Sequence, residues 1–341
     1  MSRPTDQGVP AQEAASAPVE LLLHFDDEAA QAGALARELG VPARCIACHR
    51  FPDGELRLTL PAPLPPRVAL LRGLHDPNEK IVQLLIAAPA ARELGARDLV
   101  LVAPYLAYMR QDIAFAPGEA VSQRHLGAAL ASWFDAVVTV DPHLHRVATL
   151  DEVLPGRRGV AVSAADAIGR FVAACVPGAL LLGPDEESAQ WVARAAAAGA
   201  VAAGGAGRPA EGALDHAVCR KRRHGDRAVE VALPAVDLRG RAVALIDDVA
   251  STGRTLVEAA RAALGAGAAS VDVAVTHALF VGTALAELRA AGVREVWSSD
   301  TVPHPSNAVA VAPLLAGALR ELAIQRDATL ACRRAERRNT P

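Results

Sequence analysis

The chain lacks a surplus of basic residues. Its 341 residues include 35 Lys and Arg against 38 Asp and Glu, which gives a formal net charge of −3. Proteins that bind nucleic acid or anionic membranes through surface charge carry a basic excess, so neither is expected as a partner. No apolar stretch approaches the roughly 20 residues of a membrane span. Residues 1–18 have no basic start followed by an apolar run, so they predict a disordered tail, not a signal peptide, and the protein is expected to be cytoplasmic.

Cysteine is also scarce. Five cysteines in a chain of this length do not form a disulfide scaffold. Cys45-Ile-Ala-Cys48-His49 has the spacing of a covalent haem attachment site, but no export signal accompanies it. A structural zinc site would need a second pair of ligands, and the other cysteines are scattered. We therefore expect both thiols to be buried on a strand.

Hydrophobic residues are abundant, at 52% of the chain, and the length is near twice that of a usual domain. Apolar runs of strand length alternate with amphipathic stretches of helical length, which is typical of parallel sheets covered by helices. The fold class predicted is α/β with two doubly wound parallel-sheet domains, at 19–156 and 157–312. A closing helix is expected at 313–325 and a basic tail at 326–341. The Ala- and Gly-rich stretch 195–212 predicts a helix end and a flexible linker.

The stretch from Val243 to Thr255 carries the strongest functional signal. An apolar strand ends in Asp247 and Asp248, and a hydroxyl-rich turn then leads into a helix expected to begin near Leu256. Unpaired backbone N–H groups at the start of a helix, together with hydroxyl groups, can hold a phosphate dianion. The two carboxylates can accept hydrogen bonds from ribose hydroxyls or hold a metal ion. Carboxylates often merely terminate strands, but this order of features favours a sugar-phosphate site.

Four further segments fall at strand ends or in loops, where ligands bind in open α/β sheets. They are Phe51-Pro-Asp-Gly-Glu55, Pro104 to Asp112, Asp141-Pro-His143 and Arg220-Lys-Arg-Arg223. In order with the Asp247 to Thr255 stretch, they resemble the ribose-phosphate diphosphokinase family, also called phosphoribosyl-diphosphate synthases, from about Val19 to Leu322. The resemblance implies a phosphoribosyltransferase-type fold for both domains. It also implies a homo-oligomer.

The resemblance implies a substrate role for most of these residues. Phe51 and Arg110 would stack on the two faces of the adenine of ATP, because a flat ring and a planar guanidinium both stack on a base. Ribose 5-phosphate would be the second substrate. The implied ATP site also contains Asp53, Glu55, Gln111 and Asp112, and the implied ribose 5-phosphate site contains Asp247, Asp248, Ser251, Thr252, Gly253, Arg254 and Thr255.

The resemblance further implies a metal and a mobile catalytic flap. His143 and Asp185 would hold Mg²⁺ on the ATP phosphates, although Mg²⁺ prefers oxygen ligands and a loop histidine taken alone is more typical of an ordinary hydrogen-bonded residue. Lys221 and Arg223, on a flap at 220–227, would neutralise charge on the phosphates. The implied reaction transfers the diphosphoryl group of ATP to the 1-hydroxyl of ribose 5-phosphate and releases AMP.

Two departures from the family pattern leave alternatives open. Arg254 stands where the family usually has glycine, and Glu186-Glu187-Ser188 stands where many members have small residues. One alternative is a phosphoribosyltransferase, which would use the same Asp247 to Thr255 stretch but has no evident need for the adenine-binding segments. The other is a non-catalytic homologue that binds nucleotides and regulates a true synthase. Such a homologue would have no use for a charged flap.

Overall fold

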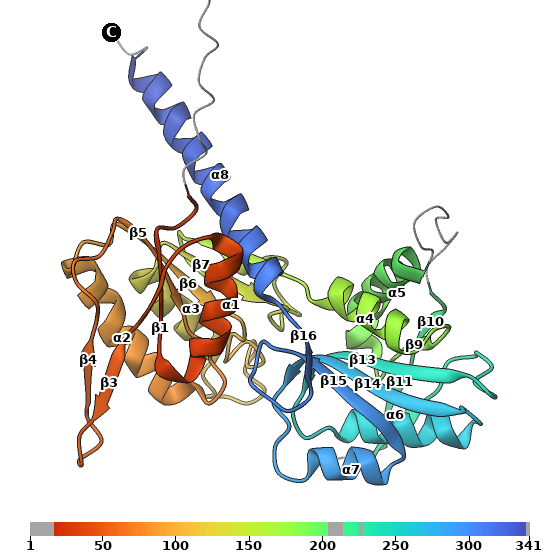
Figure 1. The fold of residues 1–341 in the computed structure, drawn as a ribbon. Helices are drawn as coiled ribbons and strands as arrows, with labels where there is room; N and C mark the ends of the chain where they lie inside the picture. The colour runs from red at the N-terminus through yellow and green to blue at the C-terminus, as the bar shows by residue number, and fades with distance from the viewer. Residues whose placement is uncertain (1–16, 204–213, 225–227, 339–341) are drawn as a thin grey trace, which may run out of the picture.

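The structure, a computed structural model, describes residues 17–203, 214–224 and 228–338. The predicted tail 1–18 and the predicted linker therefore lie largely outside the described residues. Figure 1 shows two domains side by side, with the chain running from the first to the second and its last helix, α8 (Ala312–Arg338), returning to the first. In the described residues, no helix combines the length and apolar composition needed to cross a membrane.

Each domain is built on a six-stranded sheet in which every neighbouring pair of strands is parallel. The first sheet has the order β2-β1-β5-β6-β7-β8 and the second has the order β10-β9-β13-β14-β15-β16. The predicted fold class is therefore confirmed. The strands of the first sheet are β1 (Leu21–His24), β2 (Ala43–Cys45), β5 (Arg67–Leu71), β6 (Asp98–Ala103), β7 (Ala136–Val140) and β8 (Arg158–Val162); those of the second are β9 (Leu180–Gly183), β10 (His216–Val218), β13 (Ala242–Ala250), β14 (Ser270–Ala278), β15 (Val293–Ser299) and β16 (Asn307–Val309).

Helices cover both faces of each sheet because successive residues of a buried strand point to opposite faces. In β6, for example, Val100 packs with α1 and α8 on one face, while Leu99 and Leu101 pack with α2 and α3 on the other. The second sheet is covered in the same way by α4 and α5 on one face and by α6 and α7 on the other. The helices are α1 (Ala29–Leu39), α2 (Pro77–Glu93), α3 (Ser122–Trp133), α4 (Ala165–Cys175), α5 (Ala189–Ala203), α6 (Arg254–Gly265) and α7 (Ala284–Ala290).

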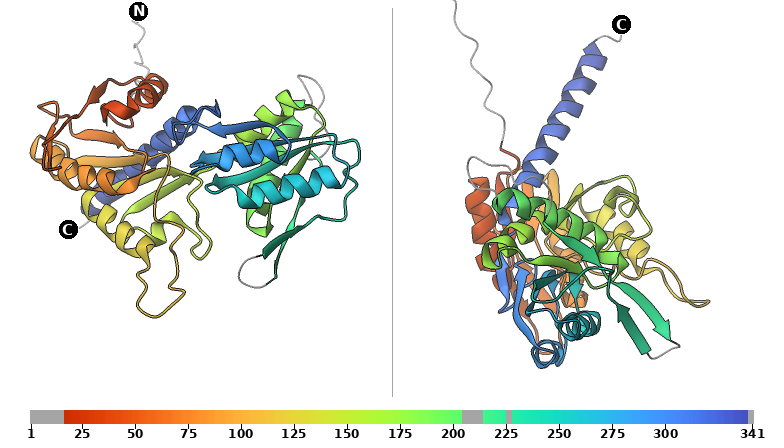
Figure 2. Two further views of the ribbon diagram at one scale, coloured as in Figure 1. Left: turned by 90° about the horizontal axis from the view of Figure 1, so that it is seen from below. Right: turned by 90° about the vertical axis from the view of Figure 1, so that its right-hand side faces the viewer.

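Two antiparallel hairpins project from these sheets. The first joins β3 (Ala47–Arg50) to β4 (Leu56–Thr59), and the second joins β11 (Arg220–His224) to β12 (Ala228–Ala232). Figure 2 shows them at opposite ends of the molecule, the first in orange at the outer edge of the N-terminal domain and the second in green on the C-terminal domain. The segments predicted to bind adenine and to form the flap therefore belong to different domains.

The expectation that the thiols of Cys45 and Cys48 are buried is wrong. Cys45 and Cys48 are both exposed. Cys45 ends β2, which is the outermost strand of its sheet, and Cys48 lies on β3, all four residues of which are exposed. Cys45 lies on an edge strand, and β3 pairs only with β4 in a two-stranded sheet, so neither cysteine is enclosed by neighbouring strands on both sides.

Two predicted boundaries also need correction. A domain boundary at residue 156 would separate β8 from the first sheet, because β8 pairs in parallel with β7. The expected basic tail from 326 onward is helical, since α8 continues to Arg338. Its Ala, Arg and Glu residues are strong helix formers, and extending an existing helix needs no new nucleation.

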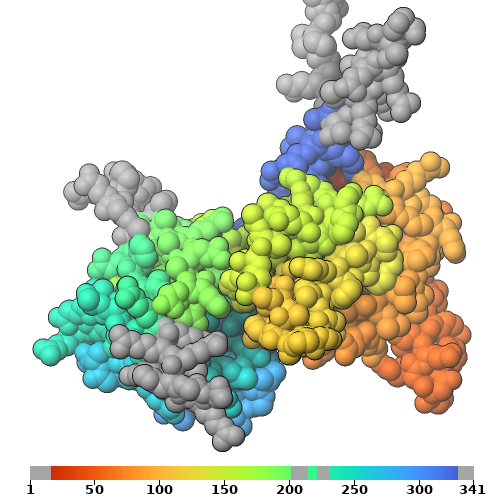
Figure 3. Space-filling model, turned by 180° about the vertical axis from the view of Figure 1, so that it is seen from behind, coloured from red at the N-terminus to blue at the C-terminus, as the bar shows by residue number. Residues whose placement is uncertain are grey.

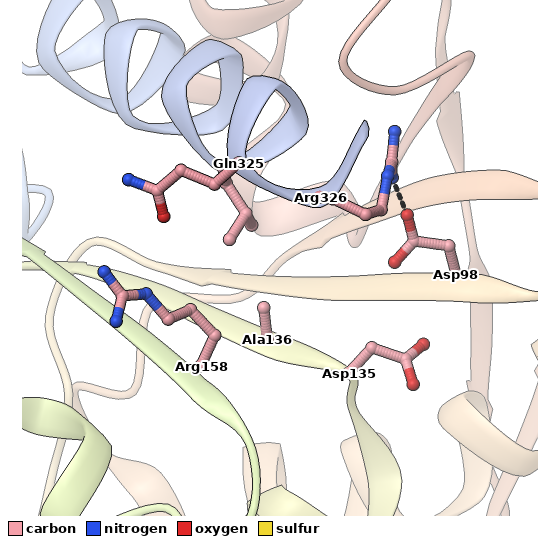
Figure 4. A pocket seen from close by; sticks show the side chains of 7 residues that line it. Asp98, Asp135, Ala136, Arg158, Gln325 and Arg326 are labelled. Carbon is pink, nitrogen blue, oxygen red and sulfur yellow. Dashed lines mark hydrogen bonds and ion pairs between the residues drawn. The ribbon is translucent and has the colours of Figure 1, made fainter. Parts of the chain in front are cut away.

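Charged contacts hold α8 against the first domain. Arg326 forms an ion pair with Asp98, and Arg320 donates to the carbonyl oxygen of Glu38. Figure 4 shows Arg326 and Asp98 at the rim of a pocket beneath the helix, with Arg158 and Asp135 on the sheet side. Because Leu315 and Leu319 of α8 are also buried in the shared core, the last helix of the chain completes the first domain.

Candidate functional site

The predicted ligand residues follow three strands at their carboxyl ends. His143 comes shortly after β7, Asp185 shortly after β9, and Asp247 and Asp248 lie in the last part of β13. β7 belongs to the first sheet, whereas β9 and β13 are neighbours in the second. The structure brings His143 and Asp248 together across the two domains, with His143 Nδ1 2.9 Å from Asp248 Oδ2. Figure 3 shows the boundary between the domains from behind, where yellow and green surfaces meet.

The adjacent carboxyl groups differ in their affinity for protons. Burial, reinforced by the charges of Asp248 and Asp185, raises the pKa of Asp247 well above its usual range. Burial also acts to raise the pKa of Asp248, but the hydrogen bond and charge of His143 outweigh it and leave this pKa lowered. When two close carboxyl groups share a site, such a split favours one proton between them. Asp247 can therefore donate a hydrogen bond while Asp248 stays ionised.

The hydroxyl-rich turn lies at the amino end of α6, as predicted, although the helix begins at Arg254, ahead of the expected Leu256. Gly253 precedes it with φ at 68°, a left-handed conformation that favours glycine. No side chain of the described residues caps this helix. The first N–H groups of α6 are therefore available to an anion, beside Ser251, Thr252 and Thr255.

Asp141 belongs to the site's framework, a role that the sequence did not reveal. Its carboxylate, 5% exposed, accepts hydrogen bonds from the Ala164 N–H, the Thr276 hydroxyl and the Trp191 indole N–H, each at 2.9 Å. These donors come from the start of α4, from β14 and from α5. Asp141 therefore ties the loop that carries His143 to the second domain.

A buried histidine reinforces this connection. His277 on β14 is 1% exposed, and its Nε2 lies 3.1 Å from the carbonyl oxygen of Val140 and 3.2 Å from that of Asp141. Its Nδ1 lies 2.8 Å from the Thr301 hydroxyl. Burial lowers the pKa of His277, so the neutral ring is the stable form. A neutral imidazole has one N–H, which Nε2 can donate to the two carbonyl oxygens.

The predicted adenine-binding residues of the first hairpin lie away from this site. Phe51 is 37% exposed, and its ring contacts His49 edge-on at 4.9 Å. The Phe51 N–H donates to the Glu55 carbonyl oxygen, and the Glu55 N–H donates to an Asp53 carboxylate oxygen, so the turn is internally ordered. Figure 1 shows the hairpin on the side of the first domain opposite to β13 and α6. One chain therefore does not bring Phe51, Asp53 and Glu55 to the Asp247 to Thr255 turn.

Arg110 lies closer to the strand-end site. Burial raises the pKa of Tyr105; the charge of Arg110 acts to lower this pKa and the charge of Asp248 acts to raise it. Arg110 and Asp248 are therefore both close enough to the Tyr105 hydroxyl to influence it electrostatically. Gln111 donates to the carbonyl oxygen of Ile113, and Asp112 forms an ion pair with Arg146 at 3.6 Å. In the described residues, Arg110 has no stacking contact with Phe51. The adenine sandwich, in which the base would lie between Phe51 and Arg110, stays a prediction.

The predicted flap begins beside Asp185. The Cys219 N–H donates to the carbonyl oxygen of Gly183, the last residue of β9, and β11 starts at the next residue, Arg220. In the hairpin, Lys221 pairs with Val231 and Arg223 with Val229. The side chains of Lys221 and Arg223, and residues 225–227 of the flap, lie outside the described residues. The hairpin thus starts at the same sheet edge as Asp185 and Asp247.

The donor atoms at this edge fit a divalent cation. Asp185 and Asp248 both raise the pKa of Asp247, so three carboxyl groups are close enough to repel one another electrostatically. A cation with oxygen ligands relieves such repulsion, and Mg²⁺ commonly binds through one or two carboxylates plus substrate phosphates. His143 is the one predicted metal ligand with a nitrogen donor.

Comparisons with known proteins cover both domains. Residues 21–132 match the family model for the N-terminal domain of ribose phosphate pyrophosphokinase, and residues 230–323 match the model for the phosphoribosyl synthetase-associated domain. The ribose-phosphate pyrophosphokinase of Methanopyrus kandleri is 37% identical over 292 residues, which are 84% of this chain and 94% of that protein. That of Thermococcus kodakarensis is 32% identical, over 86% of this chain and 95% of its own length.

A solved structure shows the same fold. The phosphoribosylpyrophosphate synthetase of Mycobacterium smegmatis superposes with a TM-score of 0.73 at 22% identity, covering 89% of this chain and 98% of its own. The two-domain fold of the protein is therefore shared with that structure. The sequence matches, which cover most of its length, show that the chain belongs to the ribose-phosphate pyrophosphokinase family.

Proposed function

We propose that the protein transfers the diphosphoryl group of ATP to the 1-hydroxyl of ribose 5-phosphate, giving 5-phosphoribosyl 1-diphosphate and AMP, with Mg²⁺ as the metal, in the cytoplasm. The observation that carries this proposal is the convergence of His143, Asp185 and the Asp247-Asp248 pair beside the uncapped amino end of α6. Family membership supports it across both domains. A phosphate anchor and a metal-binding edge are the two things that diphosphoryl transfer to a sugar phosphate needs.

The residues divide into groups with different tasks. The first N–H groups of α6, with Ser251, Thr252 and Thr255, would bind the 5-phosphate. Asp247 and Asp248 would hold ribose hydroxyls, one donating and one accepting, as their opposite pKa shifts allow. His143 and Asp185 would hold Mg²⁺, which, when bound, supplies positive charge next to the migrating phosphates.

The flap would complete the charge balance during transfer. Lys221 and Arg223 lie at alternate positions of β11, and the hairpin starts beside Asp185. Cations delivered there would stabilise charge on the transferred group and exclude water that would hydrolyse ATP. Because phosphoryl-group transfer needs positioning and charge neutralisation more than a covalent intermediate, no nucleophilic side chain is required.

The direct test is to incubate the pure protein with ATP, Mg²⁺ and ribose 5-phosphate and to measure AMP by chromatography. AMP formation that depends on the sugar phosphate is the expected result. Base-dependent release of diphosphate from 5-phosphoribosyl 1-diphosphate, without AMP formation, would favour a phosphoribosyltransferase. Tight ATP binding with neither reaction would favour a non-catalytic homologue.

The position of the first hairpin favours a homo-oligomeric enzyme. Phe51, Asp53 and Glu55 stand away from the strand-end site of their own chain, so we propose that they complete the ATP site of a second copy. Exposed apolar residues on the neighbouring helix α2 support an interface there: Val82, Leu85 and Ile86 are 44%, 49% and 38% exposed. An apolar strip on one helix face next to a projecting hairpin is a common form of contact between subunits.

This arrangement predicts complementation between two inactive variants. Phe51→Ala removes the hairpin's ring, and Lys221→Ala removes the flap's charge. If the hairpin serves a second copy, a mixed dimer contains one intact site, so random mixing in equal amounts should restore about a quarter of the wild-type activity. The measurement is AMP formation after the two variants are unfolded and refolded together.

Two controls make the result interpretable. Variants refolded separately and mixed afterwards should stay inactive as long as subunits do not exchange. Val281→Ala, which trims an exposed apolar residue of the second domain, should leave activity near the wild-type level. Co-refolded Phe51→Ala and Lys221→Ala protein with no more activity than the separate variants would show that the hairpin does not serve a second copy.

A further inference from the structure

Two histidines and a glutamate form a cluster, and the proposed reaction uses only one of them, His143. One donor atom from each of His143, His145 and Glu187 lies within 4.8 Å of the other two. His145 Nε2 is 3.2 Å from His143 Nδ1 and 4.0 Å from Glu187 Oε2. The histidines follow β7 in the first domain, and Glu187 lies in the short helical turn Glu186–Ser188 after β9 in the second. The cluster therefore bridges the two domains.

The spacing of these atoms suits ligands of one ion. Metal–nitrogen and metal–oxygen bonds near 2.1 Å hold neighbouring donor atoms roughly 3 to 4 Å apart. Asp248 Oδ2 lies 2.9 Å from the same His143 Nδ1 atom, but it does not belong to this group of mutually close donor atoms. Two imidazole nitrogens and one carboxylate oxygen thus lie close together on the domain boundary.

The charges at this point also favour a cation. Glu187 and Asp248 each have a histidine as their ion-pair partner, and a histidine carries charge only when protonated. A divalent cation between the three donor atoms would pair with the Glu187 carboxylate and accept the lone pairs of two imidazole nitrogens.

We propose that His143, His145 and Glu187 bind a first-row transition-metal dication such as Zn²⁺, Mn²⁺ or Co²⁺ in preference to Mg²⁺. Imidazole is a good ligand for these ions, whereas Mg²⁺ prefers oxygen ligands and retains its water. The site shares His143 with the proposed function, but binding is measured without either substrate. A failed binding test therefore leaves the diphosphoryl transfer untouched, and a failed transfer assay leaves this site untouched.

The experiment titrates untagged protein with Co²⁺ in excess Mg²⁺, because a histidine tag would bind the same ions. Cobalt bound by imidazole nitrogen shows visible d–d absorption, and equilibrium dialysis with elemental analysis gives the stoichiometry for Co²⁺, Mn²⁺ and Zn²⁺. The exposed Cys45 and Cys48 could bind these ions too, so both are changed to serine in the parent protein. About one ion per chain is expected in this parent.

Removing a ligand should weaken this binding. His145→Asn and Glu187→Gln should each lower Co²⁺ affinity at least ~10-fold and reduce the d–d absorption. His125→Asn and Glu295→Gln remove an exposed histidine and an exposed glutamate elsewhere and should bind as the parent does. Circular dichroism and the unfolding temperature verify that each variant is folded.

Two outcomes would overturn the proposal. The first is a parent protein without saturable Co²⁺, Mn²⁺ or Zn²⁺ binding in excess Mg²⁺. The second is binding that only His143→Asn weakens, while folded His145→Asn and Glu187→Gln bind as the parent does. That second result would mean that His145 and Glu187 form no more than a hydrogen bond and an ion pair.

Discussion

Replacing Lys221 with alanine is expected to lower kcat by ~10²- to 10³-fold, the usual effect of removing one group that stabilises transition-state charge. The affinity for ATP should change little, because the loss concerns charge that develops during transfer and not the bound substrate. Lys221 lies one residue into β11, which starts beside Gly183 and Asp185. The measurements are initial rates of AMP formation and, separately, ATP binding by calorimetry without ribose 5-phosphate.

Arg222→Ala is the matched control for Lys221→Ala. It removes one positive charge from the same hairpin, at the intervening position of β11, which pairs with Glu230. If Lys221 acts on the migrating phosphates, Arg222→Ala should keep kcat within a few fold of wild type. Equal losses in both variants would mean that the hairpin contributes only a general positive potential. Unchanged turnover in Lys221→Ala would remove this residue from the mechanism.

Replacing Asp141 with alanine is expected to produce the largest loss of stability. Its buried carboxylate accepts from the Ala164 N–H, the Thr276 hydroxyl and the Trp191 N–H, and a buried donor left without a partner costs ~1–3 kcal/mol. We expect the free energy of unfolding to fall by at least ~3 kcal/mol, allowing for some rearrangement of Thr276. Urea denaturation followed by circular dichroism and by tryptophan fluorescence measures this, and the fluorescence also reports on Trp191.

Asp141→Asn tests whether hydrogen bonding, and not the shape of the loop, explains that loss. Asparagine tolerates the positive φ of 34° at this position and retains one carbonyl oxygen that can accept from Trp191. Its amide group would face the Ala164 N–H, so we expect a smaller loss than for alanine. Thr276→Val, which removes one donor without emptying the site, should cost ~1 kcal/mol. A loss below ~0.5 kcal/mol for Asp141→Ala would show that the two domains are held together by other contacts.

The two-domain fold and the sugar-phosphate turn could be predicted because each is encoded locally. The apolar run and the Asp pair of β13 are followed directly by the Gly253 turn, so no knowledge of distant residues was needed to predict the site. β8 was missed because Arg158-Gly-Val-Ala-Val is short and partly exposed throughout, and so carries a weak apolar signal. The helical continuation of α8 was missed because the sequence from 326 onward carries no apolar periodicity.

The remaining differences arise from contacts between distant parts of the chain. Asp141 and His277 acquire their roles only when β7 and β14 of different sheets are brought together. His145 and Glu187 likewise become neighbours only across the domain boundary. The exposure of Cys45 and Cys48 follows from their places on an edge strand and in a two-stranded sheet, which strand pairing decides. Patterns within a single segment hold none of this information.

The return of α8 to the first domain also bears on how the protein is made. Leu315 and Leu319 fill the core beside β7 and α1, yet they are synthesised after all the strands of both sheets. Although N-terminal domains commonly fold first during synthesis, this one cannot bury that face until α8 has been synthesised. Nascent chains stalled before residue 312 should therefore bind chaperones through an uncovered apolar surface, and a gene fragment ending near residue 165 should give an aggregating product.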